Sequence, residues 1–486
     1  MTYREHFRTL RERCFKSLNV LKCVARTSYG ADRRTLLLLY RSIVRSKLDY
    51  ACFVYDSASE SSKKALDSVH HAALRVATGA FRTSPKSSLL AEAHEPPLSL
   101  RRQMLGMRYA LKLRQFPGHP TYPYVFSPDF NGLDRVRQSV SFGLRIKELF
   151  STVNIEFREV RRTWGTPSPP WKYAPAQVDL TLSEVKKDDL PPCVQRARAL
   201  EHIASYDGFI SVFTDGSKTE DGVGCAFVAG RDTRTFSLPS SASVFSSELV
   251  AIEKALCFIE VSDNLSYLIL SDSLSSLLAI RRFNPDNPIV QDILSRLTSV
   301  EQSGKTIKFC WIPSHVGITG NELADAAARR AAAAPCLRRL PLPARDFYPA
   351  IQTFTMSSWQ AEWHLQGSGK LRSVKPTLEP WQSCFQSNRH QEVALCRLRI
   401  GHTYATHGYL LRGEEQPTCS RCAVPLTVSH VLLSCPLAEP NRTRYLGRIA
   451  PDTTIRHLLG DDSPWVLSGN IFSFIRSINF QAIYST

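Results

Sequence analysis

The feature that most constrains the fold is a regular alternation of strand-like and helix-like segments between residues 209 and 335. Three β-rich runs follow one another with short turns between them, as in an antiparallel meander: FISVFTDGS (209–217), GVGCAFVAG (222–230) and TRTFSL (233–238). Two further apolar strands are expected within 266–273 and 305–315. They alternate with runs of helical apolar spacing, such as SSELVAIEKALCFIE (246–260). The pattern predicts an α/β domain built on five strands with flanking helices.

Acidic side chains occupy corresponding places in these segments. Asp215 and Asp272 end strands. Glu248 is expected in the first turn of one helix, and Asp325 near the start of another that Asn321 is expected to cap. Strand ends and helix starts can converge on one edge of an α/β sheet, so we expect the four carboxylates to gather there. Their repulsion would raise their pKa values unless cations were bound, and hard oxygen ligands in that number suit Mg²⁺ or Mn²⁺.

This arrangement of charge suits phosphodiester hydrolysis. Two divalent ions ~4 Å apart can activate a water molecule and stabilise the leaving oxygen. His315 lies in a glycine-containing loop before the last helix and could move protons or help the product leave. Each piece alone has an ordinary explanation, because an acid at a helix start balances the helix dipole and a loop histidine is usually solvated. The order of all five residues together is what indicates a site.

Four short motifs resemble those of type 1 RNase H, in the form carried by non-LTR retrotransposons: TDGS (214–217), SSEL-x-A (246–251), SDS (271–273) and WIPSHVGI-x-GNE-x-AD (311–325). The resemblance covers residues 209–335 and implies an RNase H-like mixed five-stranded sheet with flanking helices. It also implies metal-dependent endonucleolytic hydrolysis of RNA in RNA/DNA hybrids. His315 would match the family's loop histidine, which handles protons and product release. Two divalent ions would be held by four carboxylates: Asp215, which would bridge both ions, Glu248, Asp272 and Asp325.

The sequence departs from the family at one substrate-binding element. Some cellular RNases H carry an extra basic helix that grips the hybrid, between the third acid and the last strand. Here the segment 281–305 has room for about one ordinary helix, with Arg281 and Arg282 as its main cations. We therefore expect grip on the substrate to come from elsewhere in the chain.

The segments before this domain also resemble part of a retroelement protein. LYRSIVRSKLDYACFVYDSAS (39–59) and RVATGAFRTSPKSSLLAEAHEPPLSLRR (75–102) are similar to the region that follows the polymerase palm in non-LTR reverse transcriptases. The aromatic-x-Asp-Asp turn of a polymerase is absent from the sequence, and the Asp-Asp pairs at 188–189 and 461–462 lie in loop-like contexts. The chain is therefore expected to be a truncated retroelement product without a polymerase motif.

Composition divides the chain into four segments. They are a mostly helical region (1–150), a linker or irregular segment (151–208), the RNase H-like domain (209–335) and a C-terminal region (336–486) with a CCHC-like module at about 394–440. Of the net charge of +17, the first segment holds +14, whereas the RNase H-like domain holds −3. Cations so placed suggest a polyanion partner such as nucleic acid, and a solvated arginine-rich helical surface would give the same count.

The C-terminal region carries a second set of metal-ligand residue types. Cys419, Cys422, His430 and Cys435 are spaced as C-x2-C-x7-H-x4-C. Three thiolates and an imidazole suit one tetrahedral structural Zn²⁺, whereas the alternative is buried cysteines beside a core histidine. The spacing resembles the CCHC element near the end of non-LTR retrotransposon proteins, although the turn between the first two cysteines lacks the usual glycine.

Another basic segment precedes this cluster. ALCRLRIGHTYATHGYLL (394–411) mixes Arg397, Arg399, His402 and His407 with aromatic residues. The sequence leaves open whether it contacts nucleic acid or packs beneath the zinc site.

The chain has the characteristics of an intracellular protein. No apolar run approaches the ~20 residues of a membrane-spanning helix, and the N-terminus is too charged for a secretory signal. Thirteen scattered cysteines favour a reducing compartment. We therefore expect a nuclear or cytoplasmic protein that binds nucleic acid and no membrane, with protein partners unspecified. The expected function is an RNA–DNA hybrid ribonuclease, and the alternative is a catalytically silent nucleic-acid-binding remnant of a retroelement.

Overall fold

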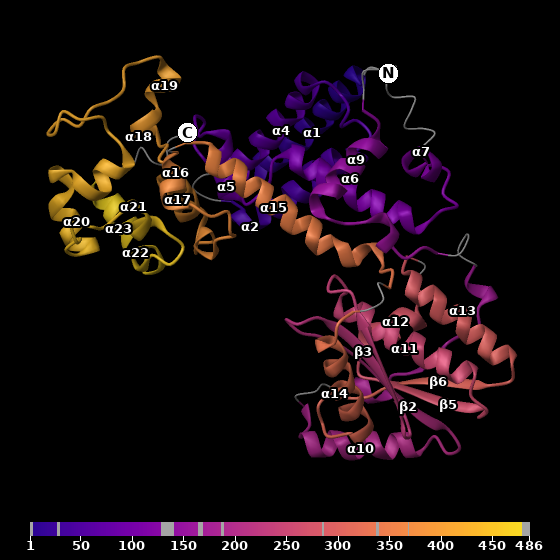
Figure 1. Ribbon diagram of the computed structural model, residues 1–486. Coiled ribbons are helices and arrows are strands. Elements are labelled where there is room, and N and C mark those ends of the chain that lie inside the picture. The colour runs from indigo at the N-terminus through magenta and orange to yellow at the C-terminus, as the bar shows by residue number, and fades with distance from the viewer. Residues whose placement is uncertain are drawn as a thin grey trace. The chain divides into compact units, whose positions relative to one another are not determined.

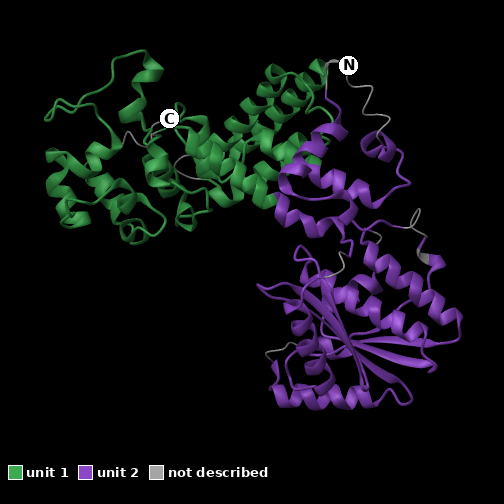
Figure 2. Cartoon of the chain, in the orientation of Figure 1, with its two compact units in different colours: residues 1–106, 352–486 green, residues 107–351 purple. Residues whose placement is uncertain are grey.

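The chain forms two compact units, one of residues 1–106 and 352–486 and one of residues 107–351 (Figure 2). The computed structural model describes residues 3–26, 30–127, 140–163, 169–185, 189–283, 286–336, 340–367 and 369–478. Two helices each include a boundary between the units: α6 (Leu98–Gln115) and α15 (Tyr348–Leu365).

The unit of residues 107–351 is built on a sheet of six strands in the order β1-β6-β5-β2-β3-β4. The strands are β1 (Gln177–Asp179), β2 (Ile210–Lys218), β3 (Val223–Ala229), β4 (Asp232–Leu238), β5 (Ser266–Ser271) and β6 (Thr306–Trp311). The β2–β3 and β3–β4 pairs are antiparallel, and the β2–β5, β5–β6 and β1–β6 pairs are parallel. The predicted α/β class and mixed sheet are therefore confirmed.

Helices cover both faces of this sheet (Figure 1). Besides parts of α6 and α15, the α-helices among the described residues of the unit are α7 (Tyr122–Phe126), α9 (Phe142–Val153), α10 (Pro192–Ala204), α11 (Val244–Glu260), α12 (Leu274–Arg281), α13 (Pro288–Gln302) and α14 (Thr319–Ala333). Every residue of β3 is buried, as expected for a strand covered on both faces. The alanine-rich face of α14 lies close against it, because a Cβ on Gly224 would come within 2.6 Å of the Ala328 carbonyl oxygen.

The sixth strand, β1, comes from the segment 151–208, which composition predicts to be a linker or irregular. β1 pairs with β6, and α10 follows it and packs Ala199 against the β5 residues Leu268 and Leu270. The three residues of β1 include a single apolar side chain, so no alternating pattern marks them in the sequence.

The unit of residues 1–106 and 352–486 is helical, as predicted for the N-terminal region. Besides parts of α6 and α15, its α-helices are α1 (Arg4–Val24), α2 (Arg33–Leu39), α3 (Ser46–Asp49), α4 (Glu60–Thr78), α5 (Lys86–Ala93), α16 (Lys370–Val374), α17 (Arg389–Ile400), α18 (Tyr404–His407), α19 (Tyr409–Arg412), α20 (Glu439–Leu446), α21 (Ile455–Leu459), α22 (Pro464–Leu467) and α23 (Asn470–Ser477). Early and late parts of the sequence share one hydrophobic core here, in which Leu36 and Leu74 cluster with Leu395 and Phe474.

The expectations of no membrane-spanning helix and of a reducing compartment concern the helices and the cysteines of the structure. Among the described residues, no helix combines the length and the apolar character that membrane crossing requires. The thirteen cysteines, all within the described part, are free and form no disulfide.

Candidate active site

The parallel pairing of β2 with β5 places two of the predicted acids at the same level of the sheet. Thr214 of β2 lies opposite Ser271 of β5. Asp215 and Asp272 are the next residues along the two strands, so both arrive at the same edge. Asp215 is buried, with only 6% of its surface exposed, and Asp272 is half-buried.

Glu248 reaches the same edge from α11. The helix begins at Val244 after the N-cap Ser243, so Glu248 is its fifth residue and lies one position beyond the predicted first turn. The approach of β2 to α11 depends on Gly216, because a Cβ there would lie 2.5 Å from the Glu248 backbone nitrogen. The glycine of the TDGS motif therefore allows the second acid to stand beside the first.

Asn321 has a different place from the predicted one. Helix α14 begins at Thr319 with Ile318 as its N-cap, so Asn321 does not cap the helix. Its side chain is 2% exposed and donates from Nδ2 to Asp272 Oδ2 at 3.2 Å. The sequence shows a good capping residue just before a helix but does not show the carboxylate across the sheet edge. Asn321 therefore contacts one of the predicted acids, a bond that the sequence pattern did not predict.

Asp325 lies near the acid cluster but is not part of its tightest group. Ligand atoms of Asp215, Glu248 and Asp272 all lie within 4.8 Å of one another. Asp325 belongs to a second such group with His315 and Glu322, and it pairs with Arg329 at 2.9 Å. The four carboxylates thus form a close trio with a neighbouring acid.

The loop histidine, His315, belongs to this second group with Glu322 and Asp325. His315 is exposed and adopts a left-handed backbone conformation with φ +56°. Burial raises the pKa of Asp272, and the hydrogen bond from Asn321 and then the nearby His315 oppose this rise. The structure therefore places His315 near two of the predicted acids on a turn that faces solvent.

The electrostatic environment of Asp215, Glu248 and Asp272 favours a bound cation. Burial, then the charges of Asp272 and Asp325, raise the pKa of Asp215 to about 7. Burial and Asp215 raise the pKa of Glu248 well above its usual range, and burial raises that of Asp272. One oxygen of Glu248, Oε2, is buried without a hydrogen-bond partner among the described residues. Carboxylates in this state suit a divalent ion, so the residues present fit Mg²⁺ or Mn²⁺.

Between the third acid and the last strand, the structure agrees with the expected short connection. The segment 281–305 contains the one helix α13 among its described residues, and Arg281 and Arg282 are exposed just before it. Arg296 on α13 pairs with Glu260 on α11 at 3.0 Å. That cation is therefore engaged within the unit.

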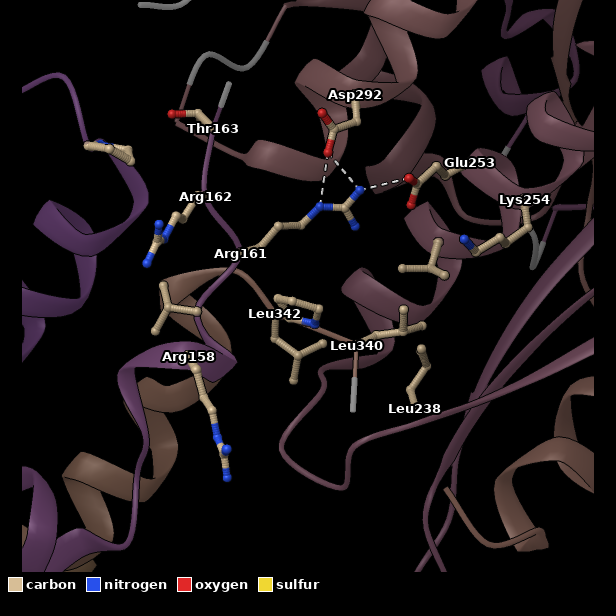
Figure 3. Close-up of a pocket in the computed structure, with 14 residues that line it drawn as sticks. Arg158, Arg161, Arg162, Thr163, Leu238, Glu253, Lys254, Asp292, Leu340 and Leu342 are labelled. Atoms are coloured by element: carbon tan, nitrogen blue, oxygen red, sulfur yellow. Dashed lines mark hydrogen bonds and ion pairs between the residues drawn. The ribbon is translucent and has the colours of Figure 1, made fainter. Parts of the chain in front are cut away.

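One cavity of this unit lies away from the acids. It measures about 660 Å³, and none of the five predicted catalytic residues lines it. Figure 3 shows Arg161 at its wall, where Nη2 donates to Asp292 at 2.6 Å and to Glu253 at 2.7 Å. This ion network ties the segment around Arg161 to α11 and α13, which gives the arginine a structural role.

The C-terminal cysteines and histidine also come together. Ligand atoms of Cys419, Cys422, His430 and Cys435 lie within 4.8 Å of one another. His430, then backbone groups of Cys422 and Arg421, lower the pKa of Cys419 to about 6, which favours its thiolate. Nε2 of His430 has no hydrogen-bond partner among the described residues. The cluster is compatible with a zinc knuckle.

Comparison with known proteins agrees with this geometry. Residues 208–333 match the family model for RNase H. No curated protein matches the chain. The chain therefore carries an RNase H domain over these residues, which supports RNA–DNA hybrid ribonuclease activity and nucleic-acid binding.

Proposed function

With an RNase H domain as the premise, we propose that the chain is a divalent-metal-dependent endonuclease of type 1 RNase H. It would hydrolyse RNA phosphodiesters in RNA/DNA hybrids. The observation that carries the proposal is the convergence of Asp215, Glu248 and Asp272 within 4.8 Å, in a buried setting that raises their pKa values. A polar trio of this kind is costly to leave uncompensated, and bound cations would remove the cost.

Each residue of the site has a distinct proposed role. Asp215, central in the cluster, would contribute to both metal positions, and Glu248 and Asp272 would complete one of them. Asp325 would help with the second, which requires it to exchange its ion pair with Arg329 for the metal. Two Mg²⁺ or Mn²⁺ ions would supply an activated water and stabilise the leaving oxygen.

The remaining residues would orient the acids and move protons. Asn321 would hold Asp272 in place through its 3.2 Å hydrogen bond. His315, exposed on its turn, can reach solvent and would carry protons or assist product release. Neither role requires the histidine to be a metal ligand.

We further propose that the chain is part of a retroelement product and contains no polymerase site of its own. The resemblance of 39–59 and 75–102 to post-palm segments, and the CCHC spacing, support this origin. Of the two Asp-Asp pairs, Asp188 lies outside the described residues. Asp461 accepts hydrogen bonds from the Ser383 backbone, at 2.8 Å, and from its hydroxyl, which gives this acid a structural role.

A cleavage assay on a labelled RNA/DNA hybrid, with and without Mg²⁺, tests the main proposal. Asp215→Asn should abolish Mg²⁺-dependent cleavage, and His315→Ala should slow it by ~10²-fold or less, the scale of one acid–base contribution. Asp221→Asn is the matched control, because Asp221 is an exposed acid at the β2–β3 turn of the same sheet. Cleavage by Asp215→Asn at the parent rate would refute the metal-site assignment.

The alternative is a catalytically silent nucleic-acid-binding remnant. It predicts that the parent chain binds hybrids but does not cut them with Mg²⁺ or Mn²⁺. Because the trio is present and close-set, we favour the active enzyme.

A further inference from the structure

The basic segment 394–411 contains two buried arginines and two stacked histidines, of which His402 lines a cavity. Arg399 is 1% exposed, and it donates to the Leu459 carbonyl at 2.8 Å and to the Ser383 hydroxyl at 2.6 Å. Arg397 is also buried and donates to the Gly79 carbonyl at 2.9 Å. These two arginines hold the helical core together, so they are not available to a ligand.

The two histidines are arranged differently. Their rings stack with centroids 3.6 Å apart and 19° between planes. His402 Nδ1 lies 3.0 Å from the Thr83 hydroxyl, and Lys370 Nζ lies 2.8 Å from His407 Nε2. Since an ammonium can only donate, His407 accepts at Nε2 and must be neutral there.

A glycine makes this arrangement possible. Gly401 ends α17 in the left-handed conformation, with φ +76°. A Cβ at Gly401 would lie 2.8 Å from Lys370 Cδ, so the lysine stem passes over the bare backbone to reach the histidines. Gly401 therefore lets the Lys370 side chain lie close to the stacked imidazoles.

Lys370 and His402 border a cavity of about 470 Å³ in the helical unit. Lys370, Arg372 and His402 line it, together with Ser87 and Ser88. No carboxylate occurs among its described lining residues. Burial, then the neighbouring His407 and Lys370, lower the pKa of His402 to about 3, and burial with Lys370 lowers that of His407 to about 4, so both imidazoles are neutral. The cations of the cavity are therefore Lys370, whose pKa burial lowers, and Arg372, and the described lining has no carboxylate to pair with them.

The start of α5 adds donors to the same wall. Pro85 occupies the N-cap position, and no side chain caps this helix in the described structure. Ser87 and Ser88 stand in its first turn, where backbone N–H groups lack helical partners and the helix dipole favours an anion. A phosphate group matches this combination of two fixed cations, hydroxyls and a helix start.

We propose that this cavity, which we call the Lys370 site, binds a phosphate group of a nucleic-acid backbone. Lys370 and Arg372 would supply the charge, and His402 and the first turn of α5 would orient the phosphate. The site lies in the helical unit and does not depend on the proposed cleavage chemistry. It would give the chain a nucleic-acid contact separate from its negatively charged RNase H domain.

Binding measured without added Mg²⁺ tests this proposal separately from hydrolysis. The full-length chain is titrated against a short fluorescein-labelled single-stranded RNA by anisotropy, across a salt series. Lys370→Ala should weaken binding by ~3–10-fold and reduce the salt slope by about one, as expected for one lost phosphate contact. Arg456→Ala is the matched control, since Arg456 is an exposed cation on α21 of the same unit, outside the basic N-terminal region and the cavity lining, and its loss should change affinity by less than ~2-fold.

A second measurement identifies the ligand chemistry. Inorganic phosphate should compete with the RNA in the parent chain, and its saturation should raise the pKa of His402 measured by NMR. Lys370→Gln, which removes the charge but keeps a polar side chain, should lose both effects while retaining the parent melting temperature. Equal losses of RNA affinity in the Lys370 and Arg456 variants would overturn the proposal. Phosphate binding that depends on Lys370, with RNA binding that does not, would also overturn it by pointing to a free-phosphate site.

Discussion

Folding buries the carboxylate of Asp215 beside those of other acids at the sheet edge, and this costs free energy when the carboxylate is ionised. In metal-free protein the pKa of Asp215 is about 7, against about 3.9 for a free aspartate. Below about pH 4 the group is protonated in both the folded and the unfolded state and has no effect on stability. As the pH rises from about 4 to 7, the unfolded state loses its proton first, and the folded state is penalised by up to ~4 kcal/mol.

Because ionised Asp215 destabilises the metal-free folded state, the Asp215→Asn substitution should remove that penalty. In metal-free protein the variant should be more stable than the parent, and the gap should widen between about pH 5 and pH 8. Thermal unfolding at both pH values measures the gap, and Asp221→Asn should show none. Mg²⁺ should close the gap by stabilising the parent, because an ion that binds only the folded state raises its stability. A gap that is independent of pH would contradict the raised pKa.

The sequence could predict the site residues that lie in short motifs, but not the contacts that depend on tertiary packing. Asp215, Glu248, Asp272, His315 and Asp325 lie in motifs of characteristic spacing, so they could be named in advance. The Asn321 bond to Asp272 and the Arg329 pair with Asp325 could not, because each depends on how α14 meets the sheet. Their assigned roles in catalysis stay predictions until the variants are assayed.

At the level of elements, the site depends on how closely β2 approaches α11. The Cβ of Gly216→Ala would lie 2.5 Å from the Glu248 backbone nitrogen, so the strand and helix must separate. Such overpacking typically costs about 1–3 kcal/mol and would move Glu248 away from Asp215. We expect lower stability and a larger loss of cleavage than of hybrid binding. Gly118→Ala is the control, because its Cβ would meet nothing within 4 Å, and equal behaviour of the two variants would contradict the argument.

The turn that follows the first two cysteines of the CCHC cluster holds an alanine in a left-handed conformation. Ala423, directly after Cys422, adopts φ +56°, a conformation that glycine takes without strain. Its N–H donates to the Cys419 carbonyl at 2.9 Å, so the turn is closed despite the alanine. Ala423→Gly should therefore stabilise the helical unit by ~0.5–1 kcal/mol. Ala405→Gly, within helix α18, should destabilise it by about 1 kcal/mol, and chemical denaturation of both variants checks the opposite signs.

Elements differ in how well the sequence predicts them. β2 to β6 and α11 have clear periodicity and were predicted. β1 is three residues long, and its partner β6 lies more than a hundred residues later, so only the tertiary pairing defines it. The shared core of α4 and α17 is equally invisible in local patterns, because it joins segments from opposite ends of the chain.

Across the whole molecule, charge counts overstate the cations free to bind nucleic acid. Several arginines in the first 106 residues form internal ion pairs: Arg33 with Glu92, Arg45 with Glu95, Arg101 with Asp49 and Arg102 with Asp56. Internal pairing accounts for part of the positive charge without a polyanion. The expectation that residues 1–150 help grip the hybrid stays a prediction.

That expectation can be tested with two kinds of arginine. Arg33→Met should cost about 3–5 kcal/mol of stability, because Glu92 is left buried and without its arginine partner. At a temperature where the variant is folded, the salt slope of hybrid binding should change little. Exposed cations such as Arg4 and Arg11 on α1 should show the reverse, with little loss of stability and a shallower slope. Unchanged slopes in both sets would mean that this region contributes nothing to substrate binding.

The division into two units predicts that removal of zinc has a local effect. Cys419 and Cys435 belong to the core of the helical unit, so a Zn²⁺ held by the four ligands would stabilise that unit. Purified protein should contain about one zinc per chain. A zinc-selective chelator should increase hydrogen exchange first near residues 395–440, while cleavage of hybrids in excess Mg²⁺ continues. The Cys419→Ser, Cys422→Ser double variant should lose the metal, and zinc content unchanged in that variant would refute the site. Simultaneous loss of cleavage and of protection near 395–440 would instead show that the two units are coupled in stability.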